Sequence, residues 1–130
     1  MDLFTKLKEL KILLIDDDEW IRDSLRLFFE SEGCNLLAVE TAEEGLEKLK
    51  RHNYDIIIVD YRLPVMDGLE FLERIKSSHR NALTLLITAY GNKDIFSKAN
   101  KIGVNDLIDK PFTIKTIEQS LTRLMKDREN

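Results

Sequence analysis

The sequence has little cysteine, proline or glycine and no long apolar run, and each shortage excludes a class of protein. Cys34 is the only cysteine, so neither an intrachain disulfide nor a zinc site built from several cysteines can form. Two prolines and five glycines are too few for a fibrous or low-complexity chain. No apolar run approaches the roughly 18 residues of a membrane-spanning helix, and residues 1–10 carry charged side chains where a signal peptide would be apolar. We therefore expect a cytoplasmic protein that does not insert into a membrane.

The charge balance also lacks the positive excess of a nucleic-acid-binding protein. The chain has 24 acidic residues against 20 lysines and arginines, for a net charge of -4. This balance argues against a broad basic face, and we expect no direct DNA binding by this chain. With 130 residues, of which 43% are hydrophobic and 34% charged, the chain is long enough for one globular domain.

Short apolar segments alternate with helical patterns along the whole chain. The segments expected to be strands cover residues 11–15, 36–39, 55–59, 83–88 and 106–109. The helical patterns fall near residues 21–29, 42–49, 69–75, 93–102 and 114–126. This alternation predicts an α/β fold of the flavodoxin-like, doubly wound kind, with a five-stranded parallel sheet in the order 2-1-3-4-5 and five helices.

Polar residues with a shared chemistry follow the apolar segments. They are Asp16 and Asp17 after the first, Asp60 after the third, Thr88 at the end of the fourth and Lys110 after the fifth. Because the carboxyl ends of parallel strands meet at one edge of a sheet, we expect these side chains to converge. Clustered carboxylates are ligands for a hard cation such as Mg²⁺, for which Mn²⁺ can substitute.

Asp60 is the best candidate nucleophile in this cluster. It alone comes from the middle strand, and it precedes a loop that leaves its carboxylate accessible. Phosphoryl transfer to a carboxylate needs in-line access and neutralisation of the equatorial oxygens, which Mg²⁺, the Lys110 ammonium and the Thr88 hydroxyl would supply. The residues therefore favour metal-assisted phosphoryl transfer to Asp60.

Four motifs in this order and spacing make the chain resemble a response regulator receiver domain of two-component signalling, over essentially its whole length after residue 10. The motifs are Ile15-Asp16-Asp17-Asp18, Val59-Asp60-Tyr61-Arg62-Leu63-Pro64-Val65-Met66-Asp67-Gly68, Ile87-Thr88-Ala89 and Lys110-Pro111-Phe112-Thr113. Each motif alone is weak, whereas the set is very specific.

The resemblance implies roles for the residues of the cluster. Asp60 would take phosphate from the phosphohistidine of a sensor histidine kinase or a phosphotransfer protein. Asp17, Asp60 and the backbone carbonyl of Arg62 would bind Mg²⁺ directly, and Asp16 mainly through a water molecule. Thr88 and Lys110 would sense the phosphate. A final implication is a cis peptide bond before Pro111.

The family also implies a signalling role rather than a conventional enzyme activity, with only self-catalysed phosphorylation and dephosphorylation of the aspartate. The face formed by residues 93–102, 106–109 and 114–126 would change its affinity for a downstream protein or an output domain. The resemblance is compatible with a monomer or with a phosphorylation-dependent dimer. The numbering of the sequence favours a stand-alone regulator over a fragment of a longer protein.

The sequence departs from the family at one switch position and is distinctive at two others. Leu107 occupies the place where the family carries an aromatic residue that turns inward after phosphorylation. Arg62 and Tyr90, two residues beyond Asp60 and Thr88 respectively, flank the phosphorylation pocket in this family. We hypothesise that these two bulky side chains shield the acyl phosphate from water and lengthen its lifetime.

The role of the first ten residues stays open at this level. We divide the chain into an N-terminal extension of residues 1–10, a receiver domain of residues 11–127 and a tail of residues 128–130. The apolar stripe of the extension, Leu3, Phe4, Leu7 and Leu10, fits an extra helix on the sheet edge, half of a dimer contact, or disorder.

The rival function is a haloacid-dehalogenase-like phosphatase with Asp16 as its nucleophile. The sequence has residues of the types found in its motifs, namely Asp16, Asp18, Thr88 and Lys110. Against it, Trp20 replaces the usual threonine or valine, and 130 residues leave no room for a cap domain.

Overall fold

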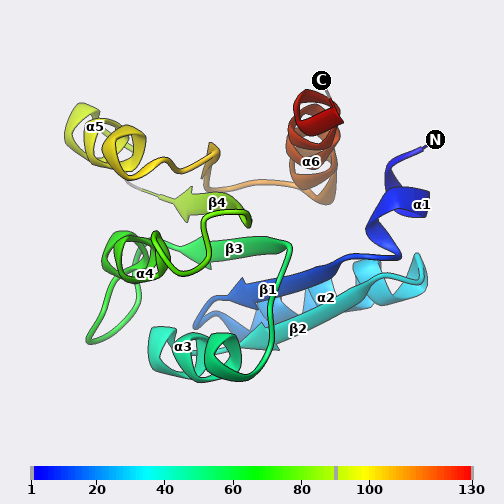
Figure 1. The fold of residues 1–130 in the computed structure, drawn as a ribbon, viewed down its shortest axis with the longest axis horizontal. Coiled ribbons are helices and arrows are strands. Elements are labelled where there is room, and N and C mark those ends of the chain that lie inside the picture. The colour runs from blue at the N-terminus through cyan, green and yellow to red at the C-terminus, as the bar shows by residue number, and fades with distance from the viewer. Residues whose placement is uncertain (1, 90, 130) are drawn as a thin grey trace.

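Five parallel strands form one sheet in the order β2-β1-β3-β4-β5, as the sequence predicts (Figure 1). The computed structural model describes residues 2–89 and 91–129. The strands are β1 (Lys11–Ile15), β2 (Asn35–Val39), β3 (Ile56–Asp60), β4 (Leu83–Thr88) and β5 (Asp106–Asp109). Since β1 and β3 lie inside the sheet with helices over both faces, their apolar residues are buried on both sides.

Three helices cover each face of the sheet. The helices are α1 (Leu3–Leu7), α2 (Glu19–Ser31), α3 (Ala42–Arg51), α4 (Gly68–Ile75), α5 (Lys93–Ile102) and α6 (Ile114–Glu129). Figure 1 shows α3, α4 and α5 on the left, with α1 and α6 on the right. Successive strand residues point to opposite faces, so Ile12 and Leu14 join the core under α1, α2 and α6, whereas Leu13 and Ile15 join the other core. None of the described helices combines the length and the apolar content that a bilayer crossing needs.

The N-terminal stripe forms a sixth helix, α1, where five were predicted. Leu7 is fully buried in the core shared with α2 and α6, and Leu3 and Leu10 pack against that core. The Phe4 ring meets Phe28 of α2 edge-on, with 5.6 Å between the ring centroids. Of the three alternatives that the sequence leaves open, the packed helix is therefore the one in the structure.

Several element boundaries differ by one to three residues from those expected, among them those of β3 and α6. The third strand is shifted by one residue, so Asp60 is the last residue of β3 rather than the first after it, and it pairs with Ile87 of β4. The last helix continues to Glu129 instead of ending near residue 126. Arg128, expected in a solvated tail, donates a hydrogen bond to the backbone carbonyl of Asn81, which ties the end of α6 to the α4–β4 loop.

Helix caps fix the loops at the carboxyl edge of the sheet. Asp18 caps α2 by accepting hydrogen bonds from the N–H groups of Trp20 and Ile21. Thr41 caps α3, and Asp67 caps α4. These caps set the directions in which the helices leave the sheet edge.

Candidate functional site

The residues singled out in the sequence converge at the carboxyl edge of the sheet. Asp16 and Asp17 follow β1, Asp60 ends β3, Thr88 ends β4 and Lys110 follows β5. The strands are parallel and in register, so their last residues lie side by side. The convergence therefore comes from the strand order, which makes β1 and β3 neighbours although 40 residues separate them.

The distances place four charged groups around one point. Carboxylate oxygens of Asp16, Asp17 and Asp60 lie within 4.8 Å of one another. The Lys110 ammonium lies 3.1 Å from Oδ1 of Asp60 and 3.9 Å from Oδ2 of Asp16. Three carboxylates and one ammonium leave a formal charge of -2, so the cluster attracts a divalent cation.

A cavity of about 240 Å³ opens above this cluster. Asp17, Asp60, Arg62, Thr88 and Lys110 all contribute to its wall. Asp60 and Thr88 are buried, with 3% and 1% of their surface exposed, whereas Asp17 is exposed. A ligand entering the cavity therefore meets the Asp60 carboxylate at its base.

The pKa values of Asp60 and Lys110 are both raised, and at each residue the effect of burial opposes the effect of the neighbouring charge. Burial raises the pKa of Asp60, and the hydrogen bond and charge of Lys110 counteract this only in part. Burial acts to lower the pKa of Lys110, but the charges of Asp16 and Asp60 outweigh it, so the net shift is upward. Lys110 therefore stays protonated at neutral pH, ready to pair with an anion.

Asp16 lies beneath the cavity with no exposed surface. Its Oδ1 accepts a hydrogen bond from the Asp18 N–H at 2.9 Å, whereas none of the described residues donates a hydrogen bond to its buried Oδ2. Burial raises the pKa of Asp16 to about 6; the Asp18 hydrogen bond opposes this and the charge of Asp60 adds to it. A buried carboxylate oxygen that accepts no hydrogen bond destabilises the folded state unless a cation coordinates it.

The raised pKa of Asp16 predicts a pH dependence of stability in the metal-free protein. The folded pKa of about 6 exceeds the ordinary value of 3.8, so the folded state holds a proton that the unfolded state has released. This stabilisation is complete below about pH 4 and is lost as the pH rises through 6. Relative to the neutral variant Asp16→Asn, the wild type should lose about 2 kcal/mol of unfolding free energy between pH 4 and pH 7.

Urea unfolding in a chelator at several pH values measures this difference. Asp127→Asn, which neutralises an exposed carboxylate on α6, is the matched control and should follow the wild type. Parallel pH curves for the wild type and Asp16→Asn would contradict the prediction.

The residues present fit a hard divalent cation. The donor set consists of carboxylate oxygens, which suit Mg²⁺ or Mn²⁺ better than softer metals. A bound cation would neutralise the formal charge of the cluster and would coordinate Oδ2 of Asp16, which lies 3.9 Å from the Lys110 ammonium and accepts no hydrogen bond from the described residues. The 4.8 Å limit lets the three carboxylates reach one ion directly or through a bound water.

The loop between β3 and α4 contains a strained turn that the sequence did not reveal. The Met66 N–H donates to the carbonyl of Pro64 at 2.8 Å, which closes a γ-turn with φ of 71° at Val65. A positive φ is unfavourable for a β-branched residue by roughly 1–2 kcal/mol. The sequence contains no signal of this turn, because valine disfavours a positive φ.

Gly68, at the start of α4, lets the β3–α4 loop return close to β3. A Cβ there would collide with the carbonyl oxygen of Asp60. The Gly68 N–H also donates to the carbonyl of Tyr61 at 2.9 Å. This close approach holds the loop beside the Asp60 carboxylate.

Three further positions were singled out in the sequence. The peptide bond between Lys110 and Pro111 is cis. Leu107 lies on β5 opposite Leu86 and is half-buried against the core under α3, α4 and α5. Tyr90 lies outside the described residues.

The chain is similar to known proteins in sequence and in fold. The family described as the response regulator receiver domain matches residues 12–122. Sporulation initiation phosphotransferase F of Bacillus subtilis is 29% identical over 120 residues, which cover 92% of this chain and 97% of that protein. A cyclic di-GMP phosphodiesterase of Thermotoga maritima is 27% identical over 117 residues, which cover 90% of this chain but only 31% of that protein.

A solved structure supports the same likeness. A CheY-like response regulator receiver domain protein from Methanospirillum hungatei matches with a TM-score of 0.81 and 28% identity, covering 91% of this chain and 98% of that one.

Proposed function

The chain belongs to the response regulator receiver domain family of two-component signalling, and on this premise we propose that Asp60 is its phosphoryl acceptor. One observation carries the proposal. Asp60 alone among the clustered carboxylates is buried in the sheet, lines the cavity and lies 3.1 Å from the Lys110 ammonium. Asp16 lies below the cavity, and Asp17 is exposed at its rim.

The proposed donor is a phosphohistidine of a sensor histidine kinase or phosphotransfer protein. An oxygen of Asp60 attacks phosphorus while the P–N bond breaks, and its electron pair stays on the ring nitrogen. The imidazole, already protonated on its other nitrogen, leaves neutral. Lys110 neutralises charge on one phosphoryl oxygen, and the Thr88 hydroxyl donates a hydrogen bond to another.

Receiver domains of this family generally bind Mg²⁺ through acidic residues. A bound Mg²⁺ supplies positive charge to the phosphoryl oxygens. For this chain we assign the ligands to the carboxylates of Asp16, Asp17 and Asp60 and the backbone carbonyl of Arg62, with Mn²⁺ as a substitute ion. The fit of the carboxylate cluster to a hard cation supports this assignment.

Mapping the modified residue tests the proposal. The protein is incubated with acetyl phosphate and Mg²⁺, the acyl phosphate is trapped by borohydride reduction, and the peptides are identified by mass spectrometry. Modification of Asp60 is expected. Modification of Asp16 would instead favour a haloacid-dehalogenase-like phosphatase, which the family match and the full burial of Asp16 do not favour.

The module is a signalling domain rather than a conventional enzyme, and we propose that it catalyses only its own phosphorylation and dephosphorylation. Arg62 lines the cavity above Asp60, so its side chain can exclude water from the acyl phosphate. Together with Tyr90, we expect it to lengthen the phosphate lifetime.

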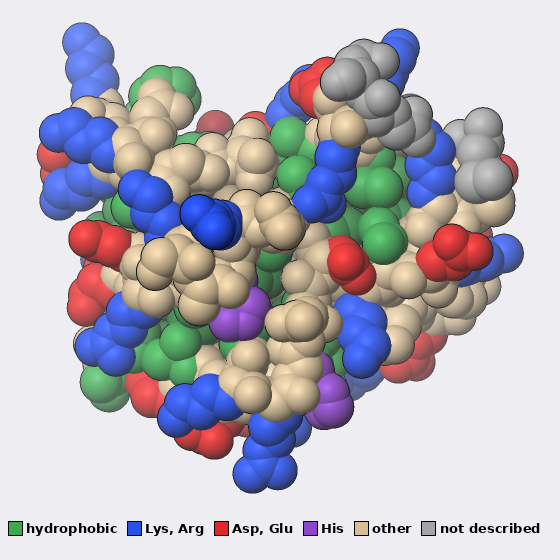
Figure 2. Space-filling view, in the orientation of Figure 1, with side chains coloured by type: hydrophobic (Ala, Val, Ile, Leu, Met, Phe, Trp, Pro, Cys, Tyr) green, Lys and Arg blue, Asp and Glu red, His purple; other side chains and the backbone are tan. Residues whose placement is uncertain are grey.

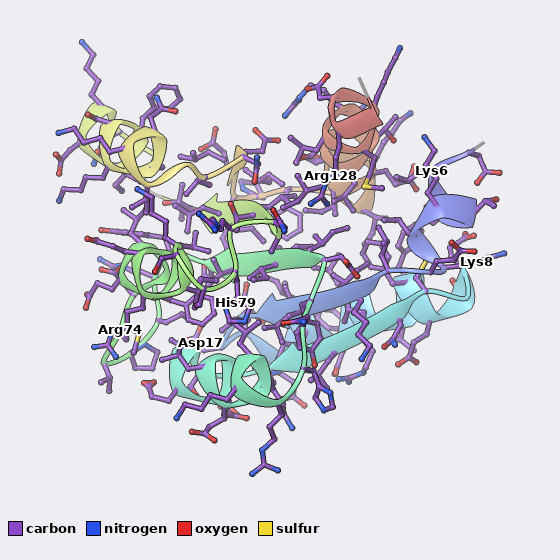
Figure 3. The ribbon with its side chains drawn as sticks, viewed as in Figure 1. Lys6, Lys8, Asp17, Arg74, His79 and Arg128 are labelled. Atoms are coloured by element: carbon purple, nitrogen blue, oxygen red, sulfur yellow. The ribbon has the colours of Figure 1, made fainter. Side chains whose placement is uncertain are left out.

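Arg62→Asn should therefore lose phosphate several-fold faster than the wild type once the donor is removed. The decay of the phosphorylated protein by mass spectrometry measures this rate. Arg74→Asn is the control, because Arg74 is an arginine at the edge of the molecule on α4 and does not line the cavity (Figure 3). An equal decay for Arg62→Asn and the wild type would remove Arg62 from this role.

We further propose that phosphorylation changes the affinity of the face formed by α5, β5 and α6 for a downstream protein or an output domain. Leu107 has no ring to turn inward, so the response of this face would depend on Thr88. Amide chemical-shift changes in α5, β5 and α6 on phosphorylation should therefore be lost in Thr88→Ala.

The side of the molecule shown in Figure 2 carries Lys and Arg mixed with Asp and Glu, and such a mixture does not favour DNA binding to that side. Because histidine kinases use ATP, we place this exchange in the cytoplasm.

A further inference from the structure

A second and larger cavity borders the phosphoryl-accepting site. It measures about 620 Å³ and lies between the first turn of α2 and the loop from β5 to α6. Its wall is mostly apolar and includes Trp20 and Ile21 from α2 and Pro111 and Phe112 from the loop. Its volume is in the range of small-molecule sites. We call this cavity the apolar groove.

Trp20 is the most unusual residue of the apolar groove. With 79% of its surface exposed, it leaves a large ring in water, although aromatic rings gain most from burial. The Asp18 cap fixes its position, because the Asp18 carboxylate accepts from the Trp20 N–H at 2.9 Å. The backbone of Trp20 is therefore fixed at the start of α2, and its side chain contributes to the wall of the groove.

The apolar groove adjoins the cavity above Asp60. Ala89 and Lys110 line both of them. The shared Lys110 ammonium lies 3.1 Å from Asp60, so the charged end of the combined space is at the acceptor. The combined space thus suits a molecule with an anionic head at Lys110 and an apolar body toward Trp20.

We propose that the apolar groove holds the acyl chain of small acyl phosphates, so that this chain accepts phosphate from acyl groups longer than acetyl in preference to acetyl phosphate. The proposal rests on Asp60 being the acceptor. An Asp60 oxygen bonds to phosphorus, and the bond between phosphorus and the donor carboxylate oxygen breaks. The electron pair stays with the departing carboxylate, so charge balances and neither a proton nor a redox partner is needed.

Butyryl phosphate and acetyl phosphate test the proposal. Their leaving carboxylates have nearly the same basicity, so the donors differ mainly in two methylene groups. Each buried methylene contributes about fourfold in affinity, so the wild type should use butyryl phosphate up to about 15-fold more efficiently at low donor concentration. Trp20→Ala should bring this ratio close to one. Leu27→Ala removes a side chain of α2 that is 67% exposed outside the groove and should keep the ratio.

A binding measurement checks the same groove without phosphoryl transfer. Trp20 is the only tryptophan, so its fluorescence reports on the groove alone. Propylphosphonate, which cannot transfer its phosphorus group and is two methylenes longer than methylphosphonate, should change this fluorescence at a concentration roughly 15-fold lower than methylphosphonate does.

The outcomes separate this proposal from the function of Asp60. Labelling of Asp60 at equal rates by both donors, or a ratio that survives Trp20→Ala, overturns the proposal while Asp60 remains the acceptor. The groove would then be left to an apolar side chain of a protein donor. Failure of both donors to label Asp60 overturns the acceptor assignment and the groove proposal together.

Discussion

Replacing Asp60 with Asn should reduce phosphate incorporation at least roughly a thousandfold. The amide keeps the shape of the side chain but is a poor nucleophile, and it loses the ion pair with Lys110. Burial raises the pKa of Asp60, so a neutral amide there removes a costly buried charge. The variant should therefore fold at least as well as the wild type in the absence of metal, which separates lost chemistry from lost structure.

Intact-protein mass spectrometry after incubation with a phosphodonor and Mg²⁺ measures this loss. Asp67→Asn is the matched control, because it makes the same chemical change at the end of the same loop and keeps the cap of α4. Asp67→Asn should incorporate phosphate at the wild-type rate. Undiminished labelling of Asp60→Asn, with the phosphate found on another aspartate, would reject the acceptor assignment.

Replacing Leu7 with Ala should lower the unfolding free energy by about 3 kcal/mol and the melting temperature by roughly 10 °C. Leu7 is fully buried in the core under α1, α2 and α6, so truncation leaves a cavity there. An effect of this size means that α1 is part of the domain rather than an appended segment.

Thermal unfolding followed by circular dichroism measures the shift. Glu9→Ala is the control, because Glu9 is an exposed neighbour and its loss should change the unfolding free energy by less than about 0.5 kcal/mol. Deletion of residues 1–9 should destabilise at least as much as Leu7→Ala. A deletion variant that melts with the wild type would show that the domain does not need α1.

The sequence predicts most of the fold because the signals for each element are local. Residues 83–88 and 106–109 form strands with the bounds expected from their apolar character, and residues 93–102 form a helix with the expected bounds. The strand order follows from alternation and handedness, which leave few arrangements of five βα units. The boundary of β3 was missed by one residue, because its polar last position pairs with β4 in a way that composition does not encode.

The candidate site was also located from the sequence, since parallel strands bring their ends to one edge. The sequence did not predict how deeply each group is buried within that site. Asp16 and Asp17 are adjacent and identical in the sequence, yet the first is fully buried and the second is exposed. This difference arises from the path of the chain between β1 and α2, where Asp18 caps the helix and its N–H holds Asp16.

The sequence by itself determined the fold class, the strand order and the set of residues that meet at the sheet edge, because hydrophobic periodicity and chain connectivity are properties of the sequence. The tertiary structure decided the packing of α1 through Leu7, the strained turn at Val65, and the apolar groove that Trp20 forms beside Lys110. These features depend on contacts between segments far apart in the chain. Local patterns do not specify such contacts, so only the packed structure could show them.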